Sequence, residues 1–563
     1  MKTYKSHVLV LLYLTFIFLF LTFPLILNFN SILPGHGDTR HLSWVMAWDI
    51  HQLFHDPLHM FDANILYNTR YILASADHLI GSAIMGMPVY LLTGNLPLLY
   101  NTVYLLGFVL SGFAMYLLVR YCTGNTYAAV VAATFYAFLP YRFRHLTHPH
   151  MFNTIWIPLA FLFLDKFLRS RKGKDCALFI LFYTLTVLSS WYLGLYLSVL
   201  APIYLLAFII LGRRWRILKT IVPYLLIGAI LAGLVILPFA YPYLYNAREH
   251  GFDRELASGA NLKDYYGMVP FKDAWYRKVL HLNRASDYPF FLGMLAYFLM
   301  ALALISFRKG VPGSKRWEPP RTSPLLLFII VGLAAFLFSF GKDISYGNTV
   351  LLPGPYRLLH YFVPGFSGLR RAGRFAMLYM TAAGVIIGFG YVKLEEWVTK
   401  MKKFSPAGLC IIASLIIMSE VRAFYIKPTR MKMTFVTPEA KPYAVWLEGL
   451  EDDPVILNLP MHDNMGLESG YMIDSIHHWR RMVNGYTAFV PKTYHNYRRL
   501  MREYPSEEGI AKLKQDGITY ILLHAGEYEV ISDFEEALRS SREIPHLLEY
   551  VGRFETVYVF KIK

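Results

Sequence analysis

The sequence predicts an α-helical polytopic membrane protein with about 11 transmembrane helices, followed by a small C-terminal α/β domain outside the cytoplasm. Of its 563 residues, 55% are hydrophobic and only 17% are charged, and the mean hydropathy is +0.37. A chain this apolar does not fold as soluble domains alone. Long apolar segments recur through the first three quarters of the chain, whereas the last part has only short apolar runs.

The net charge of +17 has a membrane explanation. Much of the excess lies in short basic runs between apolar segments, at 169–174, 213–219, 308–316 and 400–403. Lysine and arginine in short loops keep a segment end on the cytoplasmic side and contact anionic headgroups. The charge therefore does not predict a nucleic-acid partner.

The apolar segments predict the order of membrane spans. The first run, Val8 to Leu27, follows two lysines and lacks a small-residue cleavage site, so we predict an uncleaved first helix. Segments long enough to span lie at 8–28, 98–121, 126–141, 151–168, 175–190, 192–212, 217–240, 289–307, 324–341, 373–393 and 407–425.

The basic loops then predict the topology in the plasma membrane. With a cytoplasmic N-terminus, all basic loops fall in the cytoplasm only if the apolar segment 79–93 does not cross. That segment is short and contains Gly81, Gly86 and Pro88. We therefore expect a transmembrane domain at 1–425 and an extracytoplasmic domain at 426–563, with further outer segments at 29–97, 241–288 and 342–372.

The first outer loop, 29–97, concentrates the acidic residues of the membrane part. Apolar residues recur at helical spacing from Asp38 or Thr39 to Phe54, which predicts an amphipathic helix. Trp44 and Trp48 lie one turn apart on it. We expect the helix to lie along the headgroups with both tryptophans at the interface.

Asp38, in H-G-D-T-R, is the first candidate for catalysis. Gly35 and Gly37 allow close approach of the backbone to a ligand. A carboxylate at the membrane surface can accept a proton from an acceptor hydroxyl or bind a metal. The alternative is that Asp38 only caps the following helix.

Asp77 and His78, in S-A-D-H-L-I-G, are the second candidates. They stand where a polar loop enters an apolar segment, so their charge must be paired, hydrated or functional. A cap at a helix start is again the alternative. Together with His36 and Asp38 they would make a possible divalent metal site, although the spacing matches no closed metal motif.

Two basic clusters are predicted on the outer side, where the positive-inside trend disfavours them. Arginine offers paired donors for a phosphate, and contact with ordinary lipid headgroups is the alternative. The candidate phosphate-binding residues are Arg142, Arg144 and His145 in Y-R-F-R-H, and Arg370, Arg371 and Arg374 in G-F-S-G-L-R-R-A-G-R-F.

Residues 426–563 predict an α/β domain. Short apolar runs at Val455 to Pro460 and Tyr520 to His524 predict strands, a helix is expected over Glu507 to Gly517, and two final strands are expected around a turn near Gly552. Aromatic and polar groups in this domain would suit either carbohydrate recognition or domain packing, at Trp479, Asn484 and Tyr486.

The chain resembles the GT-C superfamily of integral-membrane glycosyltransferases, in particular prokaryotic members with an outer C-terminal domain. The resemblance rests on Asp38 early in the first outer loop, on A-D-H-L at 76–79, on Y-R-F-R-H at 141–145 and on Gly365 to Phe375. It covers most of the chain in layout and only these short pieces in residues.

The resemblance implies inverting transfer of a sugar from a polyprenyl-phosphate carrier to a sugar, lipid or protein acceptor on the outer face. It implies that the first-loop acid serves as general base and that basic residues hold the carrier phosphate, which is the leaving group. The first loop lacks the adjacent acidic pair of protein mannosyltransferases, and the sequence has no W-W-D-Y-G motif of oligosaccharyltransferases.

Two other classes remain as alternatives. A transporter or flippase of lipid-linked saccharides predicts ionisable groups near the middle of the membrane and repeat symmetry, whereas the acids here lie in the outer loops. A non-catalytic envelope-assembly protein would leave those acids without a common role. The sequence contains neither a G-x-x-x-x-G-K-[ST] loop nor an H-E-x-x-H motif, so it does not support an ATP-driven pump or a zinc protease.

Overall fold

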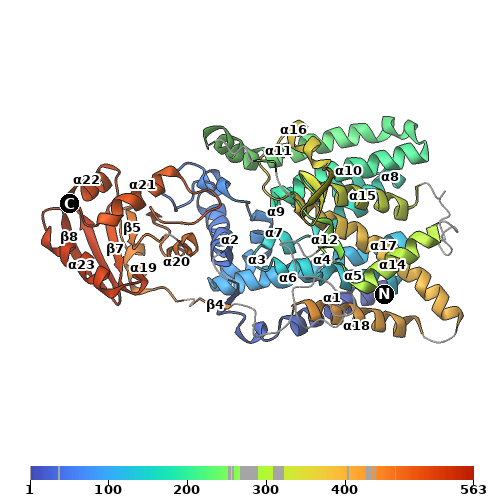
Figure 1. Ribbon diagram of the computed structural model, residues 1–563, viewed down its shortest axis with the longest axis horizontal. Helices are drawn as coiled ribbons and strands as arrows, with labels where there is room; N and C mark the ends of the chain where they lie inside the picture. The colour runs from blue at the N-terminus through green and yellow to red at the C-terminus, as the bar shows by residue number, and fades with distance from the viewer. Residues whose placement is uncertain are drawn as a thin grey trace. The chain divides into compact units, whose positions relative to one another are not determined.

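A computed structural model describes residues 2–35, 38–250, 255–256, 259–266, 290–307, 322–401, 405–425, 433–436, 439–462 and 464–563 (Figure 1). The chain forms two compact units. The first contains Met1–Leu27 and Thr102–Met431, and the second contains Asn28–Asn101 and Lys432–Lys563. The domain boundary at 425/426 stays a prediction, because these units divide the chain in another way.

The first unit is a bundle of apolar helices, as the fold class predicted. Each predicted span overlaps a helix. The helices are α1 (Lys2–Thr22), α4 (Leu96–Thr123, which begins in the second unit), α5 (Thr126–Ala137), α6 (Pro140–Arg144), α7 (Pro149–Phe152), α8 (Trp156–Ser170), α9 (Gly173–Ser189), α10 (Trp191–Gly212), α11 (Leu218–His250), α12 (Leu262–Tyr266), α14 (Met294–Phe307), α15 (Pro324–Ser339), α16 (Tyr356–Phe362), α17 (Ala376–Lys400) and α18 (Pro406–Tyr425), with a β2–β3 hairpin (Asp343–Tyr346, Thr349–Pro353).

The chain is a multi-pass membrane protein. In the described residues, 6 helices are long and apolar enough to cross a membrane, and further apolar helices are shorter. The number of spans stays a prediction. Helix α3 (Ile80–Thr93) has 14 residues, which at 1.5 Å per residue is shorter than the roughly 30 Å hydrocarbon core. Because α14, which is predicted to span, also has 14 residues, the expectation that segment 79–93 does not cross stays a prediction.

Helix α17 lies at the centre of the bundle and packs against α5, α14 and α15. Small residues make this possible, because they let helix backbones approach closely. A Cβ on Gly388 would lie 2.4 Å from the Val119 side chain of α4, and one on Gly390 would lie 1.9 Å from the Leu299 carbonyl oxygen of α14. The residues that precede α17 are therefore held at a fixed end of the bundle.

The second unit combines the first outer loop with the C-terminal residues. Its elements are β1 (Ile32–Pro34), α2 (Asp38–His55), α3, β4 (Met433–Phe435), α19 (Pro442–Glu448), β5 (Val455–Leu459), α20 (Met465–Ser475), β6 (Arg481–Met482), α21 (Lys492–Leu500), α22 (Glu507–Gln515), β7 (Tyr520–His524), α23 (Ile531–Glu543), β8 (Leu548–Phe554) and β9 (Val557–Ile562).

The C-terminal part has a five-stranded sheet in the order β6-β5-β7-β9-β8, with β5 parallel to β6 and β7 and β9 antiparallel to its two neighbours. Side chains alternate between the two faces of a strand. Leu457, Ile521 and Phe560 pack with α21, α22 and α23 on one face, whereas Tyr520 and His524 contact α19 on the other. The predicted α/β character, the β5 and β7 strands and the α22 helix are confirmed.

The two predicted final strands are confirmed as β8 and β9, but the prediction of a turn near Gly552 is wrong. Strands β8 and β9 meet at Glu555 and Thr556, and Glu555 adopts a φ of +54°. Gly552 lies within β8, where the register shifts between Tyr550 and Gly552. A glycine inside a strand often marks such a bulge.

The first outer loop pairs with the C-terminal part of the same unit. Strand β1 pairs antiparallel with β4. Farther along, Leu66 and Tyr67 donate backbone hydrogen bonds to Asn484 and Met482 at 3.1 and 3.0 Å. These contacts join segments that are more than four hundred residues apart in sequence.

Helix α2 begins at Asp38, as predicted, but its tryptophans are not exposed at an interface. Trp44 is 0% exposed and Trp48 is 4% exposed. The Trp44 indole donates to the Ser475 hydroxyl at 3.1 Å, and Trp48 donates to the Met60 carbonyl at 2.8 Å. The expectation of headgroup contact by these two rings is wrong, because α20 and the loop after α2 cover them.

Candidate functional site

Short hydrogen bonds hold the end of β1 and the first turn of α2. Thr434 on β4 donates through its hydroxyl to the Gly35 carbonyl at 2.7 Å, and Thr39 donates to the Pro34 carbonyl at 2.7 Å. Gly35 has a φ of +101°, a conformation that glycine adopts without steric cost. Gly35 and Thr39, on either side of this part of the loop, are therefore each tied to a defined partner.

Asp38 is a partly exposed carboxylate with a specific partner. The Tyr486 hydroxyl donates to its Oδ1 at 2.8 Å. The ring of His41, one turn along α2, packs edge-on against Tyr486 at 5.0 Å, and the fully buried Tyr100 lies beside Asp38 and Thr39. The start of a helix also favours negative charge, so the capping alternative describes part of the environment of Asp38. It does not account for Tyr486.

Tyr486 is held in place by a buried polar network. Asn484 is 0% exposed; its amide donates to the Asn458 carbonyl at 3.0 Å and to Glu468 Oε2 at 2.9 Å, and its Oδ1 accepts from the Asn458 amide at 2.7 Å. The Tyr486 backbone N–H lies 3.3 Å from Met472 Sδ. Asn484 thus packs the domain, which was one of its two predicted roles, and it fixes the loop that carries Tyr486.

Asp77 and His78 lie side by side at the end of the first outer loop. His78 Nδ1 is 3.9 Å from Asp77 Oδ1, and His78 is fully buried. Burial lowers the pKa of His78 to about 3, so its imidazole is neutral at pH 7. The Asp77 side chain is 8% exposed. His78 therefore lies beside Asp77 without supplying a positive charge.

Asp49 is an acid to which the sequence analysis gave no role. It lies eleven residues after Asp38, which is close to three helical turns and thus the same face of α2. It is buried and faces the backbone of Leu79, and burial raises the pKa of its carboxyl well above the ordinary value. The spacing of the two aspartates was the available signal. These contacts place the segment of Asp77 near Asp49, and the convergence of Asp77 with Asp38 stays a prediction.

The described residues do not include a group of three or more histidine, cysteine, aspartate or glutamate side chains that could hold a metal ion. His36, which belongs to the suggested metal set, lies outside the described residues. The suggested metal site therefore stays a prediction.

In the bundle, Arg142 is buried among internal partners. Its guanidinium donates to the Ala137 carbonyl at 3.2 Å and to the Thr154 hydroxyl, and its central carbon lies 5.3 and 5.0 Å from the ring centres of Phe108 and Tyr136. Arginine over aromatic rings is a stable arrangement. Arg142 thus orders the turn that carries Arg144 and His145.

Arg144 and His145 share one cationic cluster with the second predicted set. Burial, and then the positive charges of His148, Arg374, Arg144 and Arg371, hold the pKa of His145 well below its ordinary value. Like charges within a few ångströms have this effect. The two basic segments predicted from the sequence are therefore brought together within the bundle.

Tyrosines of α10 organise this cluster, and the sequence analysis missed them. The Arg374 guanidinium lies 4.3 Å from the centre of the Tyr192 ring, and the Tyr192 hydroxyl accepts from the Arg370 backbone amide at 3.2 Å. Tyr196 donates to the Arg371 carbonyl at 2.8 Å. The sequence signal was that Tyr192 lies at the junction of two apolar helices. Aromatic residues at a membrane interface commonly have the same position.

Comparison with known proteins gives structural matches alone. No protein-family model matches the sequence, and no curated protein matches it. The arabinofuranosyltransferase AftD from Mycobacteria matches with a TM-score of 0.53 at 12% identity, over 99% of this chain and 39% of that protein.

Two further solved structures match with lower scores. ArnT from Cupriavidus metallidurans matches with a TM-score of 0.48 at 12% identity, over 100% of this chain and 98% of that chain. An oligosaccharyltransferase from Archaeoglobus fulgidus matches with a TM-score of 0.48 at 13% identity, over 92% of this chain and 69% of that chain. At these identities a match concerns the fold, and the assignment rests on AftD. The chain therefore shares its fold with this membrane glycosyltransferase, in agreement with the layout that the predicted resemblance implies.

Proposed function

We propose that this protein transfers a sugar from a polyprenyl-phosphate carrier to a hydroxyl-bearing acceptor, a sugar, lipid or protein, at the outer face of the plasma membrane, with inversion at the anomeric carbon. The observation that carries the proposal is the pairing of Asp38 with Tyr486 at 2.8 Å. A carboxylate held in one orientation, yet partly exposed, is what a general base requires.

The reaction would proceed as one displacement. The acceptor oxygen forms a bond to the anomeric carbon while the bond from that carbon to the carrier phosphate oxygen breaks. The proton of the acceptor hydroxyl passes to Asp38, and the electron pair of the broken bond leaves with the phosphate. Tyr486 orients the carboxylate through its hydrogen bond and does not itself exchange a proton with substrate.

The carrier phosphate would bind the cationic cluster of the bundle. Burial first, and then the positive charges of Arg374, Arg144 and Arg371, lower the pKa of His145. A bound phosphate would relieve this repulsion and would accept paired hydrogen bonds from the arginines. These groups would then stabilise the charge that develops on the leaving phosphate. Arg370 belongs to the segment of Arg371 and Arg374. Arg142 is buried and stabilises the turn that carries Arg144.

Asp77 and His78 would support the base from the end of the first outer loop. His78 is neutral and buried, so its role would be to orient Asp77. Asp77 would then position the acceptor hydroxyl or contribute a negative charge beside it. The N-terminus would be cytoplasmic and the C-terminal domain extracytoplasmic, as the basic loops predict.

The test is a transfer assay with purified protein, a polyprenyl-phospho-sugar and a panel of sugar, lipid and peptide acceptors. Asp38→Asn removes the base and should lower kcat by about 10²- to 10⁴-fold. Arg374→Gln removes a phosphate contact and should mainly raise the KM for the donor, by roughly tenfold.

Two matched variants serve as controls. Asp56→Asn changes an exposed acid of the same loop, and Arg357→Gln changes an arginine that pairs with Asp343 at 2.6 Å. Both should keep nearly full activity. Undiminished transfer by Asp38→Asn would refute the assignment of the base, and transfer with no need for any polyprenyl-phosphate donor would refute the proposed reaction.

A further inference from the structure

A second cationic surface lies in the C-terminal domain, on α21 and the 3₁₀ turn Met501–Glu503 that follows it. His495, Arg498, Arg499 and Arg502, together with Asn496, line a hollow of about 260 Å³. These four basic residues stand at relative positions 0, 3, 4 and 7, which bring them to one side of a helix. We call this set of five residues the α21 basic pocket.

The opposite side of α21 explains why the basic residues must face outward. Tyr497 and Met501 pack into the apolar core under the sheet. His495, Arg499 and Arg502 are exposed. The helix therefore has an apolar face that packs in the core and a basic face that is exposed.

The arginines of the α21 basic pocket are not explained by a stabilising effect on α21 itself. Arginines near a helix C-terminus interact favourably with its dipole, but like charges four residues apart oppose each other. Arg498 and Arg502 have this spacing. In the described part of the chain, Arg499 and Arg502 have no carboxylate partner, and Arg499 donates only to Asn496 Oδ1, at 3.5 Å. An anion in the hollow would give Arg502 a partner of opposite charge.

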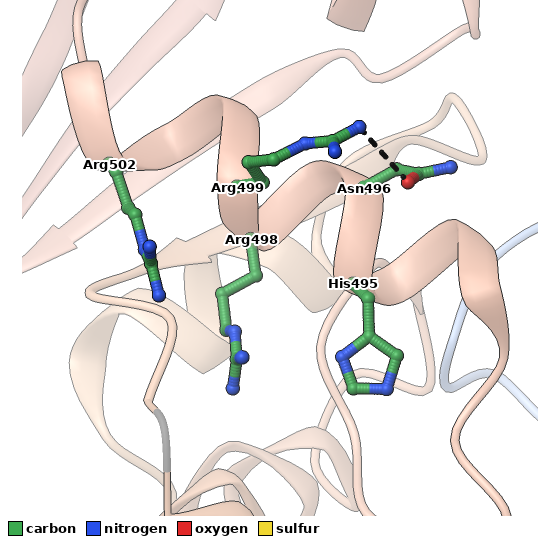
Figure 2. Close-up of a pocket in the computed structure, with 5 residues that line it drawn as sticks. All are labelled: His495, Asn496, Arg498, Arg499 and Arg502. Atoms are coloured by element: carbon green, nitrogen blue, oxygen red, sulfur yellow. Dashed lines mark hydrogen bonds between the residues drawn. The ribbon is translucent and has the colours of Figure 1, made fainter.

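The side chains are arranged for such an anion. Figure 2 shows His495, Arg498 and Arg502 projecting to the same side of the helix, while the guanidinium of Arg499 turns toward Asn496. Several guanidinium forks that face one space can bind a phosphate through paired hydrogen bonds. The hollow is near the lower end of the size of ligand pockets, which suits a group no larger than a phosphate headgroup.

We propose that the α21 basic pocket binds a phosphate group, distinct from the phosphate cluster of the bundle. The phosphate can come from a lipid headgroup or from a soluble phosphorylated compound, because both present the same oxygens to the arginines. This binding does not depend on the proposed transfer reaction.

Hydrogen–deuterium exchange on the purified full chain tests the proposal. One arm adds pyrophosphate to protein in detergent and follows the amides of residues 492–503. The other compares nanodiscs of phosphatidylcholine alone with nanodiscs that also contain phosphatidylglycerol. Slower exchange of these amides in the first arm identifies a soluble phosphate as ligand, and slower exchange confined to anionic nanodiscs identifies a lipid headgroup.

Matched variants test whether the protection depends on the arginines of the α21 basic pocket. The double variant Arg498→Gln with Arg502→Gln should raise the apparent Kd for the protecting phosphate by roughly tenfold or more. The control changes Arg539 and Arg542 to glutamine on α23, an equal loss of charge in the same domain, and should bind as the wild type does. No protection in either arm, or equal protection in the double variant, would overturn the proposal.

Discussion

Three acids of the second unit show how the surroundings of a carboxyl group decide what it can do. Burial raises the pKa of Asp49 well above its ordinary value and so disfavours the charged form of this carboxyl group. Burial also raises the pKa of Glu468 to about 7. Asp38 is partly exposed and accepts a hydrogen bond from Tyr486. Of these three, Asp38 combines access to substrate with a fixed orientation, which is why we assign the base to it.

Glu468 makes the stability of the C-terminal domain depend on pH. Its pKa of about 7 lies above the ordinary value of 4.5, so the folded state binds the proton more tightly than the unfolded state. The resulting stability is complete below pH 4.5 and is lost as the pH rises through about 7, with a total on the order of 3 kcal/mol. We expect Glu468→Gln to reduce this loss.

The measurement is the unfolding temperature of the full chain between pH 5 and pH 8, followed by tryptophan fluorescence. The difference between wild type and Glu468→Gln isolates Glu468, because buried His524, with a pKa lowered to about 3, contributes equally to both. The unfolding temperature of Glu468→Gln should rise relative to that of the wild type as the pH rises. Glu536→Gln, an exposed acid on α23, should follow the wild type. A constant difference across this range would contradict the prediction.

At the scale of single residues, the sequence indicated which residues were candidates for the site but not which residues they contact. Asp38 and the two basic segments were predicted from their unusual places beside apolar helices. Tyr486 was predicted only as a carbohydrate or packing residue, although it is the partner of Asp38. A contact between residues 448 positions apart depends on the fold of the whole unit, and local patterns contain no information about it.

At the scale of elements, the loop after β6 connects the sheet with α2. Asn484 fixes the loop to β5 and α20, Gly485 turns it with a φ of +153°, and Tyr486 then reaches Asp38. The short strand β6 was not predicted, because two residues have no detectable alternation. The longer β5 and β7 were predicted, since a buried run of five apolar or nearly apolar residues is distinctive.

Gly485 has a conformation and a position that alanine does not fit. A Cβ there would lie 2.8 Å from the Ile65 side chain, and a φ of +153° strains an L-residue by about 1–3 kcal/mol. We expect Gly485→Ala to shift the loop, to move the Tyr486 hydroxyl from Asp38 and to lower the transfer rate by roughly tenfold. The measurement is kcat with the polyprenyl-phospho-sugar donor, together with the unfolding temperature.

Gly470→Ala is the matched control, because a Cβ at Gly470 in α20 meets no atom within 4 Å. This change should leave kcat as it is and stabilise the helix by up to about 1 kcal/mol. If Gly485→Ala lowers the unfolding temperature but leaves kcat unchanged, the loop does not position a group that the reaction needs.

At the scale of the whole molecule, the hydrophobic pattern predicted the membrane class and the α/β region but not the grouping of the chain. Residues Asn28–Asn101 belong to the same compact unit as Lys432–Lys563. The loop was expected to contact headgroups, and it instead buries Trp44 and Trp48 against protein. An amphipathic helix has the same pattern whether its apolar face meets lipid or another element, so the sequence could not distinguish these environments.

The basic loops predict the orientation of the chain in the membrane, and this orientation can be measured directly. We expect a membrane-impermeant maleimide to label Thr349→Cys, on the exposed hairpin strand β3, in intact spheroplasts. Lys172→Cys, in the exposed basic loop between α8 and α9, should react only after the membrane is permeabilised. The physical reason is that loops rich in lysine and arginine remain on the cytoplasmic side.

The background for this labelling is the chain with Cys122, Cys176 and Cys410 changed to serine. Cys176 and Cys410 are buried and Cys122 is partly exposed, so retained transfer activity must show that the background protein is folded. The reverse pattern, with Lys172→Cys labelled in spheroplasts and Thr349→Cys protected, would invert the topology. The β2–β3 hairpin would then face the cytoplasm, and a reaction at the outer face of the membrane would be refuted.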